Sequence, residues 1–112
     1  MEKVFINKTV LRGIVGSVRT FTAGGKTGAN ISIITRHAYR NREGQDVTED
    51  TWHRITAWER AGIADLSKIA KGMWIEVQGR RTDRRYTDAD GDERIVSEVQ
   101  AATLYIIKDD DD

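Results

Sequence analysis

The chain has 112 residues, enough for one modest hydrophobic core and a single domain. It contains no cysteine, which excludes disulfides, thiol catalysis and cysteine-ligated zinc. Its 18 basic and 18 acidic side chains balance, but four of the acids form the terminal run 109–112, so the remainder is mildly basic. That excess is compatible with a polyanionic partner, although many unrelated domains share it.

These features predict how the chain is organised. We expect one domain over residues 1–108 and a short, solvated, disordered acidic tail over 109–112. Met1 is followed by charged residues and an alternating segment instead of an apolar run of membrane-spanning or signal-peptide length. Together with the lack of cysteine, this predicts a cytoplasmic protein without a membrane anchor.

Strand patterns dominate the first half of the chain. Residues 4–21 alternate apolar and polar side chains, and Gly13 and Gly16 stand where a long strand would bend. A turn over 23–28 leads into a second alternating segment over 29–39. The sequence therefore predicts a curled first strand that pairs with a second strand.

A polar loop over 40–50 precedes a third strand, and the period then changes. Between Ala61 and Lys71 the apolar residues fall at spacings of three and four, and Gly72 is a typical helix stop. This segment predicts the one helix of the chain.

Two more strands follow, over 73–86 and 94–107, joined by the hairpin turn 87–93. Three strands, a helix and two strands fit an all-β fold, the five-stranded Greek-key barrel known as the OB-fold, with the helix between strands 3 and 4. An immunoglobulin-like sandwich fits less well, because it requires more strands and no mid-chain helix.

The third strand carries an unusual face. Its alternation separates the buried-type residues Ile55 and Ala57 from two tryptophans and two arginines, which share the opposite side: Trp52, Arg54, Trp58 and Arg60. Single-stranded nucleic acid suits such a face, because bases stack on indole rings while arginines attract phosphates. A lone strand tryptophan is more often a core or subunit-contact residue, but two in phase with arginines favour the nucleic-acid interpretation.

Other aromatic residues divide into two groups. Tyr39 and Tyr86 lie among arginines, with Arg84 and Arg85 directly before the second, so they are either stacking platforms or rim residues whose arginines pair with nearby acids. We expect the aromatic residues in apolar surroundings to be core: Phe5, Phe21 and Tyr105.

Four segments together resemble the bacterial single-stranded DNA-binding protein family. They are NKTVLRGIVG at 7–16, TWHRITAWER at 51–60, KGMWIEVQGRR at 71–81 and RRYTDADGDERIVSEV at 84–99. The resemblance implies that four aromatic residues stack on DNA, at Tyr39, Trp52, Trp58 and Tyr86. It also implies basic contacts at Arg54, Arg60, Arg84 and Arg85.

The resemblance further implies a homotetramer that coats single-stranded DNA during replication, recombination and repair, in the bacterial cytoplasm at the nucleoid. His53 matches a family position near subunit contacts, and Trp74 lies on a polar strand face where subunits could pack. We therefore expect His53 and Trp74 at an interface between subunits.

One departure concerns the end of the chain. Family members usually carry a glycine- or proline-rich linker and an acidic tip with apolar last residues that recruits partner enzymes. Here Lys108 runs directly into the acidic tail. The segment by which family members usually recruit replication or repair enzymes is therefore not expected here. Two explanations stay open: the chain is truncated, or it is a phage or mobile-element form of the family.

Two other binding functions and an enzyme are the alternatives to this interpretation. A primosomal or RNA-binding relative would use the same barrel, because stacking and phosphate contacts serve both DNA and RNA. A protein-interaction module would use the aromatic residues as binding hot spots. An enzyme is not expected. Its best catalytic group would be His53 with Glu59 or Asp50, but Asp50 falls on the opposite strand face from His53, and the two histidines, His37 and His53, form no metal motif. No metal or cofactor is predicted.

Overall fold

Five long strands close into a barrel. The computed structural model describes residues 3–108, so the acidic tail at 109–112 lies outside the described residues. The barrel order is β1-β2-β3-β5-β4. In chain order the strands are β1 (Thr9–Ala23), β2 (Lys26–Arg40), β3 (Asp46–Trp58), β4 (Trp74–Thr87) and β5 (Glu93–Ile107). The OB-fold prediction is confirmed.

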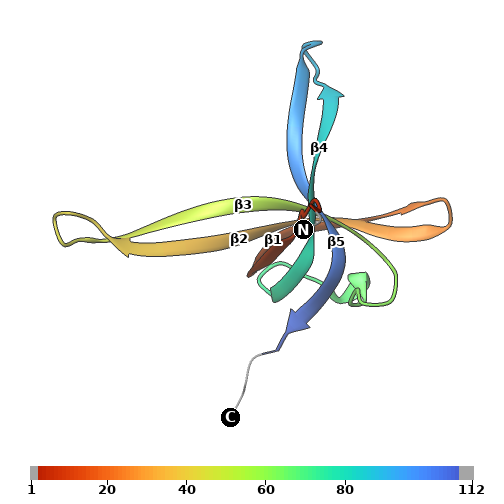
Figure 1. Ribbon diagram of the computed structural model, residues 1–112. Helices are drawn as coiled ribbons and strands as arrows, with labels where there is room; N and C mark the ends of the chain where they lie inside the picture. Colours follow the sequence, from red (N-terminus) through yellow and green to blue (C-terminus); the bar gives the residue numbers. More distant parts are fainter. Residues whose placement is uncertain (1–2, 109–112) are drawn as a thin grey trace.

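Neighbouring strands are antiparallel except where the barrel closes. There β3 and β5 run parallel, with Ile55 beside Val99 and Thr56 beside Gln100. The strands are longer than the barrel is tall, so three hairpins, β1–β2, β2–β3 and β4–β5, extend from it in different directions (Figure 1). The structure is therefore a small barrel from which three β-hairpins project.

The core is aliphatic and follows the alternation of each strand. The largest fully buried side chains are Ile33, Ile55, Ile75, Leu104, Val15, Val77 and Val99. Because strand residues alternate between faces, burying these side chains leaves the residues between them on the outside of the barrel. This separation places the Trp52 and Arg54 face outside, as the sequence predicted.

Gly16 and Gly79 mark the two places where strand register shifts. The first shift lies between Val15 and Ser17 in β1, and the second lies between Gln78 and Gly79 in β4. A Cβ at Gly79 would collide with the carbonyl of Gln100, so the strands can approach there only because the residue is glycine. The predicted bending of the first strand near Gly16 is confirmed.

The segment between β3 and β4 is less helical than predicted. Only one 3-10 turn forms, η1 (Leu66–Lys68), and Ile69 is already extended with φ −85° and ψ 129°. Hydrogen bonds to β5 hold the preceding residues extended, since Leu104 donates to the carbonyl of Gly62 and accepts from the amide of Ala64. The helix expected over 61–71 is therefore wrong in length, because tertiary bonding overrides the helical spacing.

The apolar residues of this segment still reach the core. Leu66 and Ile69 are buried and belong to the hydrophobic core of the barrel. Gly72, at φ 93°, turns the chain back towards β1, where its amide donates to the carbonyl of Val15. The spacing thus indicated which residues are buried, although it gave the wrong backbone conformation. None of the described residues forms a helix long and apolar enough to cross a membrane.

Three aromatic residues predicted to be core are not buried. Phe5 is fully exposed, Tyr105 is 46% exposed, and Phe21 is only partly buried. Tyr105 stands outward on β5 beside Glu76, and its hydroxyl donates to that carboxylate. The bulge at Gly16 puts Phe21 in phase with outward-facing Ser17 instead of with Val15. The prediction for these residues was wrong.

Candidate nucleic-acid interface

Three strands present one continuous outer surface. Cross-strand register aligns its residues in three rows, and we call this surface the groove face. From one end to the other, the rows are Ser17, Ser32 and Arg54, then Arg19, Asn30 and Thr56, and finally Phe21, Gly28 and Trp58. Trp52 stands beside the first row. The groove face is polar and basic in the middle and aromatic at both ends.

The indole of Trp52 lies against Gly16. Its side chain is among the exposed large apolar groups, with 59% of the residue accessible. A Cβ at Gly16 would collide with the six-membered ring of Trp52, so glycine lets this ring rest on the β1 backbone. One side of the indole is supported by β1, and the residue still offers wide exposed area for stacking.

Trp58 is held differently. It packs edge-on against Phe21, with ring centroids 5.1 Å apart and an interplanar angle of 88°. Both rings lie beside Gly28, where a Cβ would stand within 3.1 Å of the Trp58 ring. Sequence reasoning missed Phe21 as part of this surface, and the signal was its spacing of two and four residues from Arg19 and Ser17.

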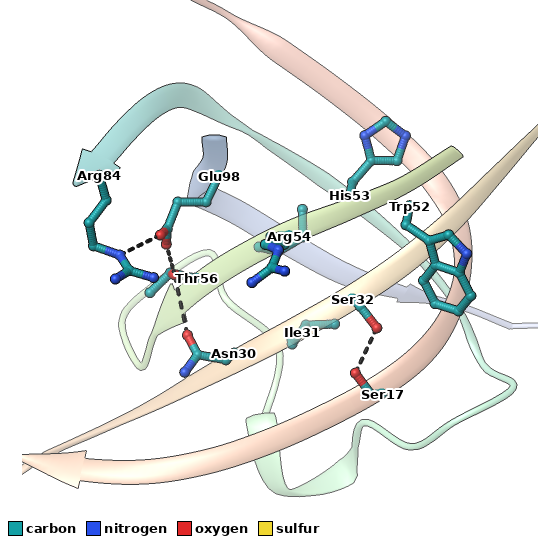
Figure 2. A pocket seen from close by; sticks show the side chains of 11 residues that line it. Ser17, Asn30, Ile31, Ser32, Trp52, His53, Arg54, Thr56, Arg84 and Glu98 are labelled. Carbon is teal, nitrogen blue, oxygen red and sulfur yellow. Dashed lines mark hydrogen bonds and ion pairs between the residues drawn. The ribbon is translucent and has the colours of Figure 1, made fainter. Parts of the chain in front are cut away.

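A cavity of about 530 Å³ lies on the groove face beside Trp52 (Figure 2). Arg54 stands in its middle, while Trp52 and Arg84 stand at opposite ends. Smaller polar groups, Glu98 and two core isoleucines complete the lining: Ser17, Ser32, Asn30, Thr56, His53, Glu98, Ile31 and Ile55. The structure thus brings together Trp52, Arg54 and Arg84, three of the residues predicted to contact DNA.

Glu98 lies at the Arg84 end of this cavity and is mostly buried. Thr56 donates its hydroxyl to Oε2 of Glu98 at 2.6 Å, and Arg84 donates Nε to Oε1 at 2.8 Å. These contacts lower the pKa of the carboxyl, Thr56 more than Arg84, with a further contribution from the charge of Arg54. The cavity therefore holds an ionised carboxylate between two arginines, which sequence reasoning did not find.

A second cavity, of about 490 Å³, contains Trp58 and Arg60. Lys8 and Arg80 add two more basic side chains to its lining, and Asn7 together with residues of β4 and β5 forms the remainder. The two tryptophans of β3 therefore share one outer face but belong to separate cavities. Each tryptophan has a predicted arginine in its own cavity.

The β4–β5 hairpin carries the next predicted pair. The guanidinium of Arg84 lies over the ring of Tyr86, 5.8 Å from its centroid. Arg85 pairs with Ile95, one position out of phase, so it points to the other face of the hairpin. Arg84 and Tyr86 thus join the groove face, whereas Arg85 does not.

Tyr39 lies on the opposite face of the β2–β3 hairpin from Trp52. Trp52 pairs with Ile34, and the register continues without a shift to the pair of Tyr39 and Val47. Tyr39 is five positions after Ile34, and an odd offset along a strand changes the face. Tyr39 instead stacks on His37 at 5.7 Å between ring centroids. Its hydroxyl donates to Glu49 at 3.2 Å, and this bond raises the pKa of Tyr39.

His53 shares the face of Tyr39. Its Nε2 lies 2.8 Å from the hydroxyl oxygen of Thr35, and partial burial, followed by the charge of Arg81, lowers the pKa of its imidazole. His53 also borders the cavity beside Trp52.

Trp74 belongs to another surface, the outer face of β1, β4 and β5. It pairs with Ile14 on one side and Ile107 on the other, and it is 44% exposed. Next to it, both Arg12 and Tyr105 donate to Glu76. These bonds lower the pKa of Glu76, Tyr105 most, because each favours the carboxylate form.

No metal centre is found among residues 3–108, since no three histidine, cysteine or acidic side chains there gather closely enough to hold an ion.

Known proteins resemble both the sequence and the fold. The model of the "Single-strand binding protein family" matches residues 6–107. Proteins named "Single-stranded DNA-binding protein" from Neisseria meningitidis serogroups A and B are each 30% identical over 105 residues, covering 91% of this chain. The chain spans 60% of the length of each of these relatives.

Solved structures extend the comparison. A "Plasmodium falciparum SSB complex with ssDNA" has a TM-score of 0.79 at 25% identity and covers 96% of this chain and all of its own. A deletion mutant of the single-stranded DNA binding protein from Thermus aquaticus has the same fold, with a TM-score of 0.72 at 21% identity, covering 92% of this chain and 51% of its own. By the match over residues 6–107, the chain belongs to the single-strand binding protein family.

Proposed function

We propose that this protein binds single-stranded DNA without sequence preference. The observation that carries the proposal is the cavity in which Trp52, Arg54 and Arg84 meet on the outside of the barrel (Figure 2). A base stacked on an aromatic ring contributes about 1–3 kcal/mol, and every base has a face to stack. Arginines beside the ring attract the phosphates that join successive bases.

The strand path that we infer runs along the groove face between the two cavities. One base stacks on Trp52, and another reaches Trp58 in the cavity that also contains Arg60. The backbone between them passes over Arg54 and the hydroxyl of Thr56, which lie two residues apart on β3. This path uses the predicted residues of β3 in the order in which they occur.

The hairpins extend the path. Tyr86 and Arg84 offer a further stacking and phosphate-binding position on β4. Tyr39 offers another on the far face of the β2–β3 hairpin, and Arg85 lies on the far face of the β4–β5 hairpin. We infer that a longer strand uses these positions after the groove face is filled.

Support also comes from the relatives. The similar structure from Plasmodium falciparum is a complex with single-stranded DNA, and the Neisseria relatives carry the name of single-stranded DNA-binding proteins. By this likeness we assign the chain the task of coating strands exposed in DNA replication, recombination and repair. We place that task in the bacterial cytoplasm, at the nucleoid.

We infer that the protein acts as a homo-oligomer, with a tetramer expected. The outer face of β1, β4 and β5 exposes Ile14 and Trp74 around the bonded pair Arg12 and Glu76. An exposed apolar surface with charges already paired suits a second copy. His53 is proposed as a further subunit contact. Analytical ultracentrifugation of Trp74→Glu is expected to give a smaller species than the wild type, and an unchanged mass would contradict this surface.

Tryptophan fluorescence tests the proposed function. Titration with oligothymidylate is expected to quench emission strongly, and the affinity should fall as salt rises. Duplex of equal length should quench weakly, and competing RNA of equal length reports whether the protein prefers DNA. No quenching by any single strand would overturn the proposal and turn attention to a protein partner for the aromatic surface.

A further inference from the structure

Glu98 is an unexpected residue in a surface that binds a polyanion. Its carboxylate lies in the wall of the cavity that holds Trp52, and only 10% of its side chain is accessible. Burying a carboxylate is costly unless hydrogen bonds and opposite charges compensate it. Thr56 and Arg84 supply both, each bonding to a different carboxylate oxygen. The arrangement is a built contact between β3, β4 and β5.

The contact with Arg84 uses only one corner of the guanidinium. In the described part of the chain, Arg84 donates one hydrogen bond, from Nε to Glu98. Its side chain remains 59% accessible, so the terminal Nη groups have room for another acceptor. The same guanidinium lies over Tyr86. Glu98 thus fixes the inner edge of Arg84, and the ring of Tyr86 supports its plane.

We propose that Glu98 is a positioning residue for phosphate binding. By holding Nε of Arg84, Glu98 presents the two Nη groups as a ready fork for a phosphate of the bound strand. A fork fixed before binding loses less side-chain entropy when the phosphate arrives. The proposal rests on the proposed binding of single-stranded DNA and adds a role for a carboxylate that the strand never needs to touch.

A different role for Glu98 predicts the opposite result. If Glu98 merely competed with phosphate for Arg84, removing the carboxylate would tighten binding and steepen its salt dependence. Removing any negative charge from the protein also strengthens its binding to a polyanion. A control variant must therefore account for this general effect. Asp83 provides the control, because it lies next to Arg84 in β4 but faces away from it. Asp83→Ala removes the same charge without touching the contact.

The test compares oligothymidylate binding by Glu98→Ala and Asp83→Ala over a series of salt concentrations. Glu98→Ala is expected to bind about five- to tenfold more weakly than Asp83→Ala, less than the full loss of a charge-assisted contact, because Arg84 itself remains. Its slope of log affinity against log salt should be shallower by about 0.7, one phosphate contact on a single strand. Glu98→Gln keeps an acceptor oxygen and should recover part of both losses.

Two further measurements separate positioning from folding. In an Arg84→Ala background, Glu98→Ala should cause no additional weakening relative to Asp83→Ala, because its target is absent. In the DNA-free protein, the NMR signal of Arg84 Nε–H should exchange slowly with water and should exchange faster in Glu98→Gln. This second readout stands even if Glu98→Ala does not fold.

The outcomes are distinguishable. Wild-type protein that does not bind oligothymidylate would overturn the proposed function and the role of Glu98 together. Wild-type binding combined with Glu98→Ala that binds as tightly as Asp83→Ala, or more tightly, would leave the function intact and overturn only the positioning role. Weaker binding with an unchanged salt slope would also overturn it, because Arg84 would then not be the group affected.

Discussion

The indole of Trp52 rests on Gly16, a residue 36 positions earlier in the chain, and no side chain of β1 separates them. Gly16 lies at the bulge where β1 shifts register against β2. One glycine therefore has two effects: it bends the strand, and it leaves the space that the exposed tryptophan occupies.

Gly16→Ala should weaken strand binding more than it weakens the fold. The added methyl would meet the Trp52 ring, which can tilt away because it is exposed, and tilting disturbs the stacking surface. We expect about tenfold weaker binding of oligothymidylate, or about 1.4 kcal/mol of binding free energy. This lies within the range of about 1–3 kcal/mol for stacking of one base. Thr22→Ala, on an exposed part of β1, is the control. Unaltered affinity in Gly16→Ala would show that the contact between Trp52 and Gly16 does not affect strand binding.

Replacing the two tryptophans should separate binding from stability. Trp52→Ala removes an exposed ring and should leave the melting temperature almost unchanged, while Trp58→Ala also loses the edge-on contact with Phe21, which contributes about 0.5–1.5 kcal/mol beyond burial. Both should weaken strand binding. Calorimetric unfolding measures the difference. A larger loss of stability in Trp52→Ala than in Trp58→Ala would contradict the arrangement of the two rings.

Arg54→Gln should reduce the salt dependence of binding by about 0.7 in the log–log slope, the value for one phosphate contact on a single strand. Arg36→Gln is a matched control, because Arg36 also lies on the β2–β3 hairpin but donates two hydrogen bonds to Asp50. Its loss should change the slope less. Equal slopes for both variants would mean that overall charge, and not the place of Arg54, governs binding.

Acid should destabilise the protein partly through Glu76 and Glu98. Tyr105 and then Arg12 lower the pKa of Glu76 below its ordinary value of 4.5, as Thr56 and then Arg84 do for Glu98. A carboxyl with a lower pKa when folded stabilises the fold above its unfolded pKa, and this stabilisation is lost as the pH falls through the folded pKa.

The double variant Glu76→Gln, Glu98→Gln tests this pH dependence. Its melting temperature should change less than that of the wild type as the pH falls from about 6 to about 3. The exposed carboxyl of Glu93 supplies the control variant Glu93→Gln, which should follow the wild type. Parallel curves for the double variant and the wild type would show that the two contacts do not govern acid unfolding.

Local alternation was enough to predict part of the site. Trp52, Arg54 and Trp58 lie on one strand, so their common face follows from the period of two and from burial of Ile55 on the other side. The barrel was also predictable, because five alternating segments and their turns are themselves local patterns. No knowledge of which strands are neighbours was needed for these conclusions.

The errors arose where a contact from a distant segment, or a bulge within the strand, decides the local structure. The helix expected over 61–71 gave way to hydrogen bonds with Leu104, which lies far along the chain. Phe21 changed faces because of the bulge at Gly16. Glu98 joined the site because closing the barrel brings β5 beside β3. The contacts of Leu104 and Glu98 have no signal within the segments that they change, whereas Phe21 had one, in its spacing from Ser17 and Arg19 on the same strand.

The β2–β3 hairpin carries aromatic residues on both faces, so a ligand that contacts both faces must be flexible. Trp52 and Tyr39 point away from each other across this thin ribbon, so a ligand that stacks on both must pass around its edge. Duplex DNA stays straight over lengths of about 150 base pairs, far more than such a turn allows. A single strand can make the turn within a few nucleotides. Discrimination against duplex can therefore arise from bending alone, before any base or sugar is recognised.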